Sequence, residues 1–237
     1  MSGFMLRVGY GKTGRLRYLG HLEVLGSIDR IVRRAGLPFA VSQGFSPHMR
    51  IAFSPALPVG ALSECEWFDL MLTSLVPVEE ALGALVDASP RELAPTRAAY
   101  VDPRSPALGA WLDRVDWEIR LVGGGLTVDC VRAALDDVVS SGHVDYLRSG
   151  KPRTVDLRRT LVSCDVRGTG PDVLLGFKTR SSNDGALRPD VLAGAILGDS
   201  RLEGASCELM DVRKIGQWHE GEDGLISPLD LAVTTSA

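Results

Sequence analysis

The stretch from His21 to Ala35, HLEVLGSIDRIVRRA, has the spacing of a helix that packs one face against a sheet. Its apolar residues recur every three or four positions, at Leu22, Leu25, Ile28 and Val32. This period places them on one side of a helix. Gly36 and Pro38 follow, and both residue types end helices. The stretch therefore predicts a helix over residues 21–35.

Strand-like segments lie on both sides of this helix, and a second helix follows. We expect strands at Phe4–Tyr10, Arg50–Ser54, Glu64–Thr73 and Leu93–Tyr100, and a helix at Val78–Asp87. The resulting order, β-α-β-β-α-β, is that of a ferredoxin-like domain.

A similar order recurs after the turn-rich run Asp102-Pro-Arg-Ser-Pro106. Strands are expected at 117–122, 144–148, 154–161, 173–179 and 206–215, and helices at 128–139 and 189–197. We therefore expect an α+β fold with two tandem ferredoxin-like domains. The predicted boundaries are 1–101 for the first domain, 102–113 for a linker, 114–218 for the second domain and 219–237 for a flexible tail.

Composition narrows the function class. The 237 residues contain no apolar run long enough to span a membrane, and the first residues lack a signal-peptide pattern. The four cysteines are far apart, at Cys65, Cys130, Cys164 and Cys207, so no zinc or iron–sulfur motif can be drawn from them. We expect buried, reduced thiols, a cytoplasmic location, no metal site and no cofactor. No nucleotide-binding or nucleophile motif occurs either.

Charge is distributed unevenly along the chain. Residues 1–60 carry eight basic and two acidic residues, although the whole chain has a net charge of −4. Such asymmetry indicates an anionic partner, with RNA as the candidate, or a solvated face balanced by the acidic middle of the chain. The candidate RNA-binding cations are Lys12, Arg15, Arg17, Arg30, Arg33 and Arg34, with Arg158 and Arg188 from a second basic stretch.

The densest polar constellation is Ser42-Gln43-Gly44-Phe45-Ser46-Pro47-His48. Ser42 and Gln43 offer directional hydrogen bonds, and Phe45 either stacks on a base or packs inward. His48 can transfer a proton near neutral pH. Together with His21 it could form the acid–base pair of a metal-independent ribonuclease, so both are candidate catalytic residues.

Five motifs resemble the radical-SAM-linked (radical-SAM-associated) domain family of unknown function. They are Lys12–Glu23 (KTGRLRYLGHLE), Arg33–Pro38 (RRAGLP), Ser42–His48 (SQGFSPH), Ala56–Gly60 (ALPVG) and Glu66–Leu70 (EWFDL). The resemblance implies a radical SAM protein as partner, fused or encoded nearby and with a cobalamin-binding-like domain. Because the C-x-x-x-C-x-x-C motif is absent, it also implies the stand-alone accessory form. The family's usual Ser before His-Leu-Asp is Gly20 here, and its usual Asn before Pro-His is Ser46.

Three functions remain open from the sequence. The first is a non-catalytic accessory protein that binds tRNA or rRNA and presents it to a radical SAM modification enzyme. The second is a metal-independent RNA-processing endonuclease that uses histidines. The third is a protein–protein adaptor that does not bind RNA.

Overall fold

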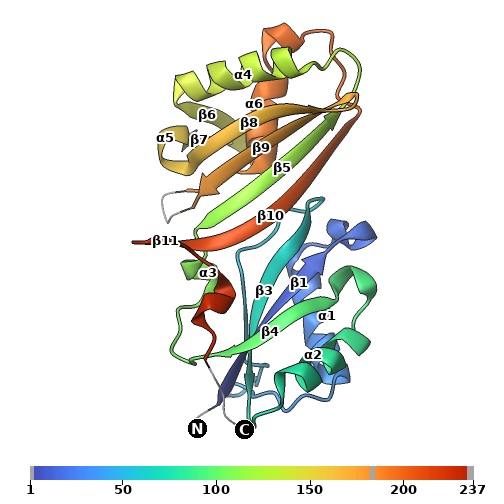
Figure 1. The fold of residues 1–237 in the computed structure, drawn as a ribbon, viewed down its shortest axis with the longest axis vertical. Coiled ribbons are helices and arrows are strands. Elements are labelled where there is room, and N and C mark those ends of the chain that lie inside the picture. The colour runs from blue at the N-terminus through green and yellow to red at the C-terminus, as the bar shows by residue number, and fades with distance from the viewer. Residues whose placement is uncertain (1–2, 182–184, 234–237) are drawn as a thin grey trace. The chain divides into compact units, whose positions relative to one another are not determined.

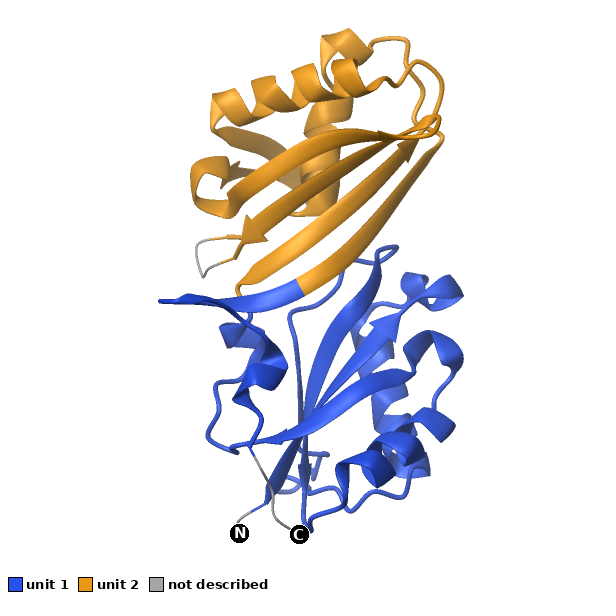
Figure 2. Ribbon diagram, in the orientation of Figure 1, with its two compact units in different colours: residues 1–112, 217–237 blue, residues 113–216 orange. Residues whose placement is uncertain are grey.

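The structure is a computed structural model that describes residues 3–181 and 185–233. The chain has a mixed α+β fold (Figure 1). It divides into two compact units (Figure 2): unit 1 comprises residues 1–112 and 217–237, and unit 2 comprises residues 113–216.

Unit 1 consists of a small sheet whose one face is covered by the two longer helices (Figure 1). Its strands lie in the order β4-β1-β3-β2, and all neighbours are antiparallel. The main elements are β1 (Phe4–Lys12), α1 (His21–Arg34), β2 (Ile51–Phe53), β3 (Leu62–Leu72), α2 (Val78–Asp87), β4 (Pro95–Val101) and α3 (Leu108–Trp111). Short 3-10 turns are η1 (Gly14–Tyr18) and η2 (Arg91–Leu93).

Helix α1 confirms the predicted helix, but its buried face differs from the predicted one. Leu22 is 80% exposed, whereas Val24, Ile28, Ile31 and Val32 are buried. The buried residues join Leu6, Val8 and Phe68 of the sheet in the main core cluster. Compared with the prediction, the buried face of the helix is turned toward Val24 and Ile31. His21 and Leu22, at the N-terminus of the helix, are exposed.

The opposite face of the unit 1 sheet carries a buried ion pair. Arg7 Nε and Nη2 donate to the two carboxylate oxygens of Asp69 at 2.7 and 2.8 Å, and Arg7 Nη1 donates to the Pro228 carbonyl at 3.1 Å. Both charged side chains are buried. A bidentate pair with a third acceptor satisfies the guanidinium inside the protein. The pair thus links β1, β3 and the segment around residue 228.

Residues 219–233 differ from the flexible tail expected over 219–237, of which residues 234–237 lie outside the described part of the chain. They contain the end of β10 (Leu209–Gly221), β11 (Gly224–Ile226) and the 3-10 turn η4 (Pro228–Leu231). Ile226, Leu229 and Leu231 pack against a cluster of Trp67, Leu108, Trp111 and Leu112. Apolar burial holds these residues in unit 1, although acids and small polar residues surround them in the sequence.

Unit 2 contains a second small sheet, in the strand order β10-β5-β9-β8, and a separate two-stranded sheet of β6 and β7. Its elements are β5 (Arg114–Val122), α4 (Val128–Ser141), β6 (His143–Arg148), β7 (Lys151–Asp156), α5 (Leu157–Thr160), β8 (Leu161–Thr169), β9 (Asp172–Arg180), α6 (Pro189–Leu197) and η3 (Ser200–Leu202), followed by β10. The strands predicted at 144–148 and 154–161 therefore pair with each other as a hairpin. The strand that pairs with β9 at the sheet edge is β8, which was not predicted.

The helices of residues 3–181 and 185–233 are all too short or too polar to cross a bilayer.

Candidate functional site

Residues 42–49 form a closed loop immediately before β2. Val41 and Met49 pair as an isolated antiparallel bridge. The Ser42 amide donates to the His48 carbonyl at 2.8 Å, and the His48 amide donates to Ser42 Oγ at 3.0 Å. Gly44 has a φ of 131°, which residues with a side chain rarely adopt. A backbone hydrogen bond and the Ser42 hydroxyl therefore close the loop.

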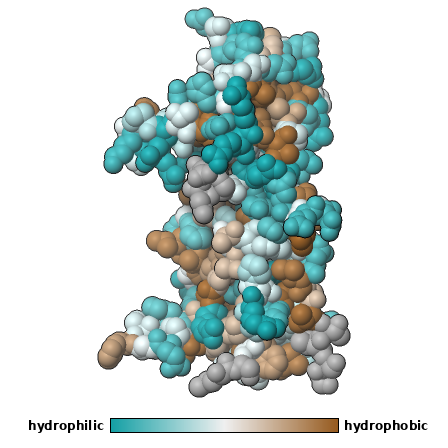
Figure 3. Space-filling view, turned by 90° about the vertical axis from the view of Figure 1, so that its left-hand side faces the viewer, coloured by the Kyte–Doolittle hydropathy of each residue, from teal (hydrophilic) through white to brown (hydrophobic). Residues whose placement is uncertain are grey.

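Phe45 lies on this loop with a relative exposure of 113%, so its side chain makes almost no contact with the protein. The inward packing that the sequence allowed for Phe45 does not occur. Gln43 and His48 are exposed as well. Hydrophobic side chains also reach the surface elsewhere on the face shown in Figure 3, among hydrophilic ones. A fully exposed aromatic ring on a hydrogen-bonded loop is ready to stack on a partner's flat group.

The arginines of α1 differ in how available they are. Arg33 Nε donates to Asp29 Oδ2 at 2.7 Å on the same helix, and its guanidinium lies 5.1 Å from the Phe39 ring centroid. Arg30 Nη2 donates to Ser27 Oγ at 3.2 Å. Arg34 is exposed at the end of the helix. Of Arg30, Arg33 and Arg34, Arg34 would therefore give up the fewest interactions on binding an anion.

The three predicted cations that precede α1, Lys12, Arg15 and Arg17, are not all exposed. Lys12 is only 3% exposed, and its Nζ donates to the Leu19 carbonyl at 2.7 Å. Arg17 Nε donates to the Gly60 carbonyl at 2.5 Å. Arg15 is exposed on η1. Lys12 and Arg17 thus hold the loops around α1 in place, and Arg15 is the residue of this group whose charge faces solvent.

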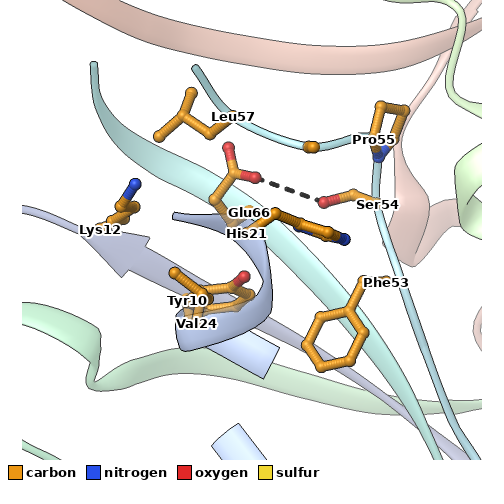
Figure 4. Close-up of a pocket in the computed structure, with 10 residues that line it drawn as sticks. Tyr10, Lys12, His21, Val24, Phe53, Ser54, Pro55, Leu57 and Glu66 are labelled. Atoms are coloured by element: carbon orange, nitrogen blue, oxygen red, sulfur yellow. Dashed lines mark hydrogen bonds between the residues drawn. The ribbon is translucent and has the colours of Figure 1, made fainter. Parts of the chain in front are cut away.

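A small polar pocket lies where β1, β3 and the start of α1 meet (Figure 4). Its volume is about 10 Å³, close to what one water molecule requires. The polar residues that line it are Tyr10, Lys12, His21, Ser54 and Glu66. Ser54 Oγ lies 3.5 Å from Glu66 Oε2, and the His21 ring meets the Phe53 ring edge-on at a centroid distance of 6.4 Å.

Buried charge in this pocket changes the acidity of Tyr10. Desolvation, and then the negative charge of Glu66, raise the pKa of Tyr10 well above its usual value of 10.0. Glu23 Oε2 accepts from the Gly20 amide at 2.7 Å, so a carboxylate already occupies the start of α1. In the sequence, His21 was placed at a helix N-terminus that could bind an anion. In the structure the carboxylate of Glu23 already occupies this helix N-terminus.

The two candidate catalytic histidines lie on different elements. His21 is the first residue of α1 and lines the pocket beside Glu66. His48 lies on the loop that is closed by the bridge between Val41 and Met49. Their joint role as an acid–base pair stays a prediction.

In unit 2, the two predicted cations lie on different elements. Arg158 is on α5, where its amide donates to Asp156 Oδ1 at 2.9 Å. Arg188 Nη2 pairs with Asp190 Oδ2 at 2.9 Å at the start of α6. Arg148, Lys151 and Arg153 of the β6–β7 hairpin are exposed as well. Lys151 and Arg153 belong to the second basic stretch of the sequence, but their arrangement on one face of the hairpin is visible only once the register is known.

The cysteines correct one expectation. All four are free thiols, but only Cys65 is buried, and Cys207 is exposed. Among the residues that the structure describes, no three His, Cys, Asp or Glu side chains gather as a metal ion would need.

Fold and surface define a mixed α+β protein that presents an aromatic ring on a closed loop and has exposed arginines in the same unit. The chain belongs to the bacterial family described as "Uncharacterized protein conserved in bacteria (DUF2344)", whose model matches residues 5–189. A search of curated proteins found no match. Among solved structures, a chain of "Crystal Structure of a Cbf5-Nop10-Gar1 Complex" is 13% identical with a TM-score of 0.47. That match covers 92% of this chain and 50% of the other, so the chain spans half the length of that one.

Proposed function

We propose that this protein is a non-catalytic accessory that binds RNA and presents it to a radical SAM modification enzyme. The observation that carries the proposal is the Phe45 ring, which is fully exposed on a loop closed by its own backbone. An exposed aromatic ring costs solubility and adds nothing to the core. Its retention on an ordered loop is consistent with a stacking role toward a base.

Exposed cations of unit 1 supply the electrostatic part of the proposal. Arg15, Arg34 and Arg50 are exposed, and Arg50 follows the loop directly. Phosphate contacts from such side chains position RNA without reading its sequence, and aromatic stacking holds unpaired bases. The chemistry of stacking plus charge favours RNA over a purely apolar protein partner.

The partner in this proposal comes from the motif resemblance to the radical-SAM-linked family. The chain itself lacks the C-x-x-x-C-x-x-C motif, so the radical chemistry belongs to the partner. As scaffold we propose two ferredoxin-like units in tandem. In support, the strand orders β4-β1-β3-β2 and β10-β5-β9-β8 correspond when β6 and β7 are treated as an insertion.

Phe45→Ala tests the RNA contact. We expect the affinity for a fluorescent single-stranded RNA or a tRNA to fall about 10-fold, because stacking contributes roughly 1–3 kcal/mol per base. Fluorescence anisotropy at low salt measures it. Leu22→Ala is the matched control, since it truncates another exposed apolar side chain of unit 1 and is expected to leave affinity unchanged.

Several outcomes would count against this function. Absence of RNA binding at low salt, or equal affinities of the Phe45→Ala and Leu22→Ala variants, would remove the RNA contact. Co-purification with a radical SAM protein that depends on Phe45 but not on RNA would favour the adaptor. Cleavage of the RNA in EDTA, abolished by His48→Ala, would favour the endonuclease.

A further inference from the structure

β6 and β7 form a two-stranded sheet that is separate from the main sheet of unit 2 and lies near α4 (Figure 1). Its turn residues, Ser149 and Gly150, have φ values of 51° and 74°. Positive φ at both central positions is the type I′ geometry, which matches the twist of two paired strands. The hairpin is anchored at its base, where Val144 and Val155 are buried. The residues beyond them extend into solvent as a two-stranded ribbon.

The register of this hairpin sorts its side chains by face. Residues that pair directly point to the same side, and the side alternates along each strand. One face therefore carries the pairs Val144–Val155, Tyr146–Arg153 and Arg148–Lys151. The other carries His143–Asp156, Asp145–Thr154 and Leu147–Pro152. All three cations of the ribbon thus share one face with its tyrosine.

The register places no acid among the paired residues of this face. Within residues 3–181 and 185–233, Arg148, Lys151 and Arg153 form no ion pair, and Arg148 and Lys151 lie directly opposite each other. The nearby Asp145 is on the other face, where it accepts from the Thr154 hydroxyl at 2.5 Å. Like charges directly opposite each other destabilise a hairpin. The pair Arg148–Lys151 therefore lowers the stability of the hairpin, and the fold itself gives no reason for it.

A cavity lies at the foot of the same face. It has a volume of about 280 Å³ and is lined by Tyr146, Arg153, Thr154, Val155, Asp156, Arg159, Thr160, Gly185 and Ala186. This volume is near the lower end of small-ligand pockets, roughly 300 Å³. The lining includes one carboxylate, that of Asp156, whose Oδ1 accepts from the Arg158 amide at 2.9 Å. The Tyr146 ring and the Arg153 guanidinium are groups that hold an unpaired base and its phosphate.

We propose that this face of the β6–β7 hairpin is a second RNA-binding surface, specific for unpaired nucleotides. Tyr146 stacks on a base at the cavity, and Arg148, Lys151 and Arg153 contact consecutive phosphates along the ribbon. Paired RNA does not fit this arrangement, because its bases are stacked on one another and its major groove is too narrow for side chains. The inference rests on the proposed RNA function and adds a contact in unit 2.

The test compares two triple variants of the full chain. R148Q/K151Q/R153Q removes the three cations of the ribbon, and R104Q/R167Q/R201Q removes three arginines that are paired with acids elsewhere. Both variants lose the same net charge. We expect the first to weaken single-stranded RNA binding and to reduce the slope of log affinity against log salt by about 2, at about 0.7 per lost phosphate contact. The second is expected to change the slope by much less.

A second variant separates stacking from charge. Tyr146→Ala is expected to weaken binding of a single-stranded probe about 10-fold and to leave blunt double-stranded RNA unaffected. Equal slopes of the two triple variants, an unchanged affinity of Tyr146→Ala, or preference for an acidic peptide over RNA overturns the hairpin surface. If the Phe45→Ala effect persists in that case, the proposed function stands; if the wild-type protein binds no RNA, both fail.

Discussion

At the scale of single residues, Tyr10 is the side chain whose chemistry the fold changes most plainly. Burial and the neighbouring charge of Glu66 raise its pKa well above 10.0. Below pH 10 both the folded and the unfolded chain keep the phenol proton. Above pH 10 the unfolded chain loses this proton while the folded chain retains it, so this tyrosine makes stability fall as pH rises.

Replacing Tyr10 by Phe removes this contribution. We expect the free energy of unfolding of Tyr10→Phe to gain on the wild type by up to about 1.4 kcal/mol per pH unit above pH 10. Urea unfolding at pH 8 and pH 11 measures it, with Tyr18→Phe as the exposed control. A wild-type-to-variant difference that stays constant between these pH values would contradict the raised pKa.

Residue identity alone located some exposed candidate positions. The loop at 42–48 was recognised from its polar and aromatic composition, and the structure shows Phe45 and His48 exposed there. Lys12 was predicted as an RNA-binding cation, yet it is 3% exposed and its ammonium donates to the Leu19 carbonyl. Such burial depends on a carbonyl brought close by the turn of η1, which composition does not reveal.

At the scale of elements, η4 has only four residues, but its leucines pack against the core cluster of Trp67 and Trp111. We expect Leu229→Ala to lower the free energy of unfolding by about 1–3 kcal/mol, because the side chain packs against the tryptophan cluster. Leu225→Ala, at an exposed position four residues earlier, is expected to change it by less than about 0.5 kcal/mol. Equal effects of the two variants, measured by chemical denaturation, would show that η4 does not close this core.

Elements with a strong period were predictable, and weakly patterned ones were not. Helix α1 was found because Leu22, Leu25, Ile28 and Val32 recur every three or four positions, although only Ile28 and Val32 of these are buried. Strand β8 was missed because, of its nine residues, only Val166 is buried, so it lacks a clear apolar alternation. Strand β11 has three residues, too few for any period to show. Tertiary packing defines these segments.

At the scale of the whole molecule, the net charge of −4 conceals local basic surfaces. If four to six phosphates are contacted, the slope of log RNA affinity against log salt is expected to lie between about −3 and −5. Phe45→Ala does not change the charge of the protein. We therefore expect it to lower the RNA affinity by the same factor at every salt concentration and to leave the slope unchanged. A titration series from 50 to 300 mM salt, about the usual range, gives both quantities; a slope near zero would exclude phosphate contacts.

The division into units was only partly predictable from the sequence. A boundary near residue 112 follows from the turn-rich run around Pro103 and Pro106. The return of residues 217–233 to unit 1 does not. It depends on Arg7, which donates to the Pro228 carbonyl, and on the Trp111 carbonyl, which meets His219 Nδ1; both partners are more than a hundred residues away.

This discontinuity has a consequence for synthesis on the ribosome. Arg7 is made early, but its carbonyl partner at Pro228 follows 221 residues later. At about 5–20 residues per second, roughly 5–20 s pass between the completion of residue 112 and the emergence of the segment that covers Trp67 and Trp111. During that interval Trp67 and Trp111 lack the apolar residues that cover them in the folded protein, and Arg7 lacks the Pro228 carbonyl. Unit 1 therefore exposes apolar surface of the kind that chaperones bind until unit 2 has been translated.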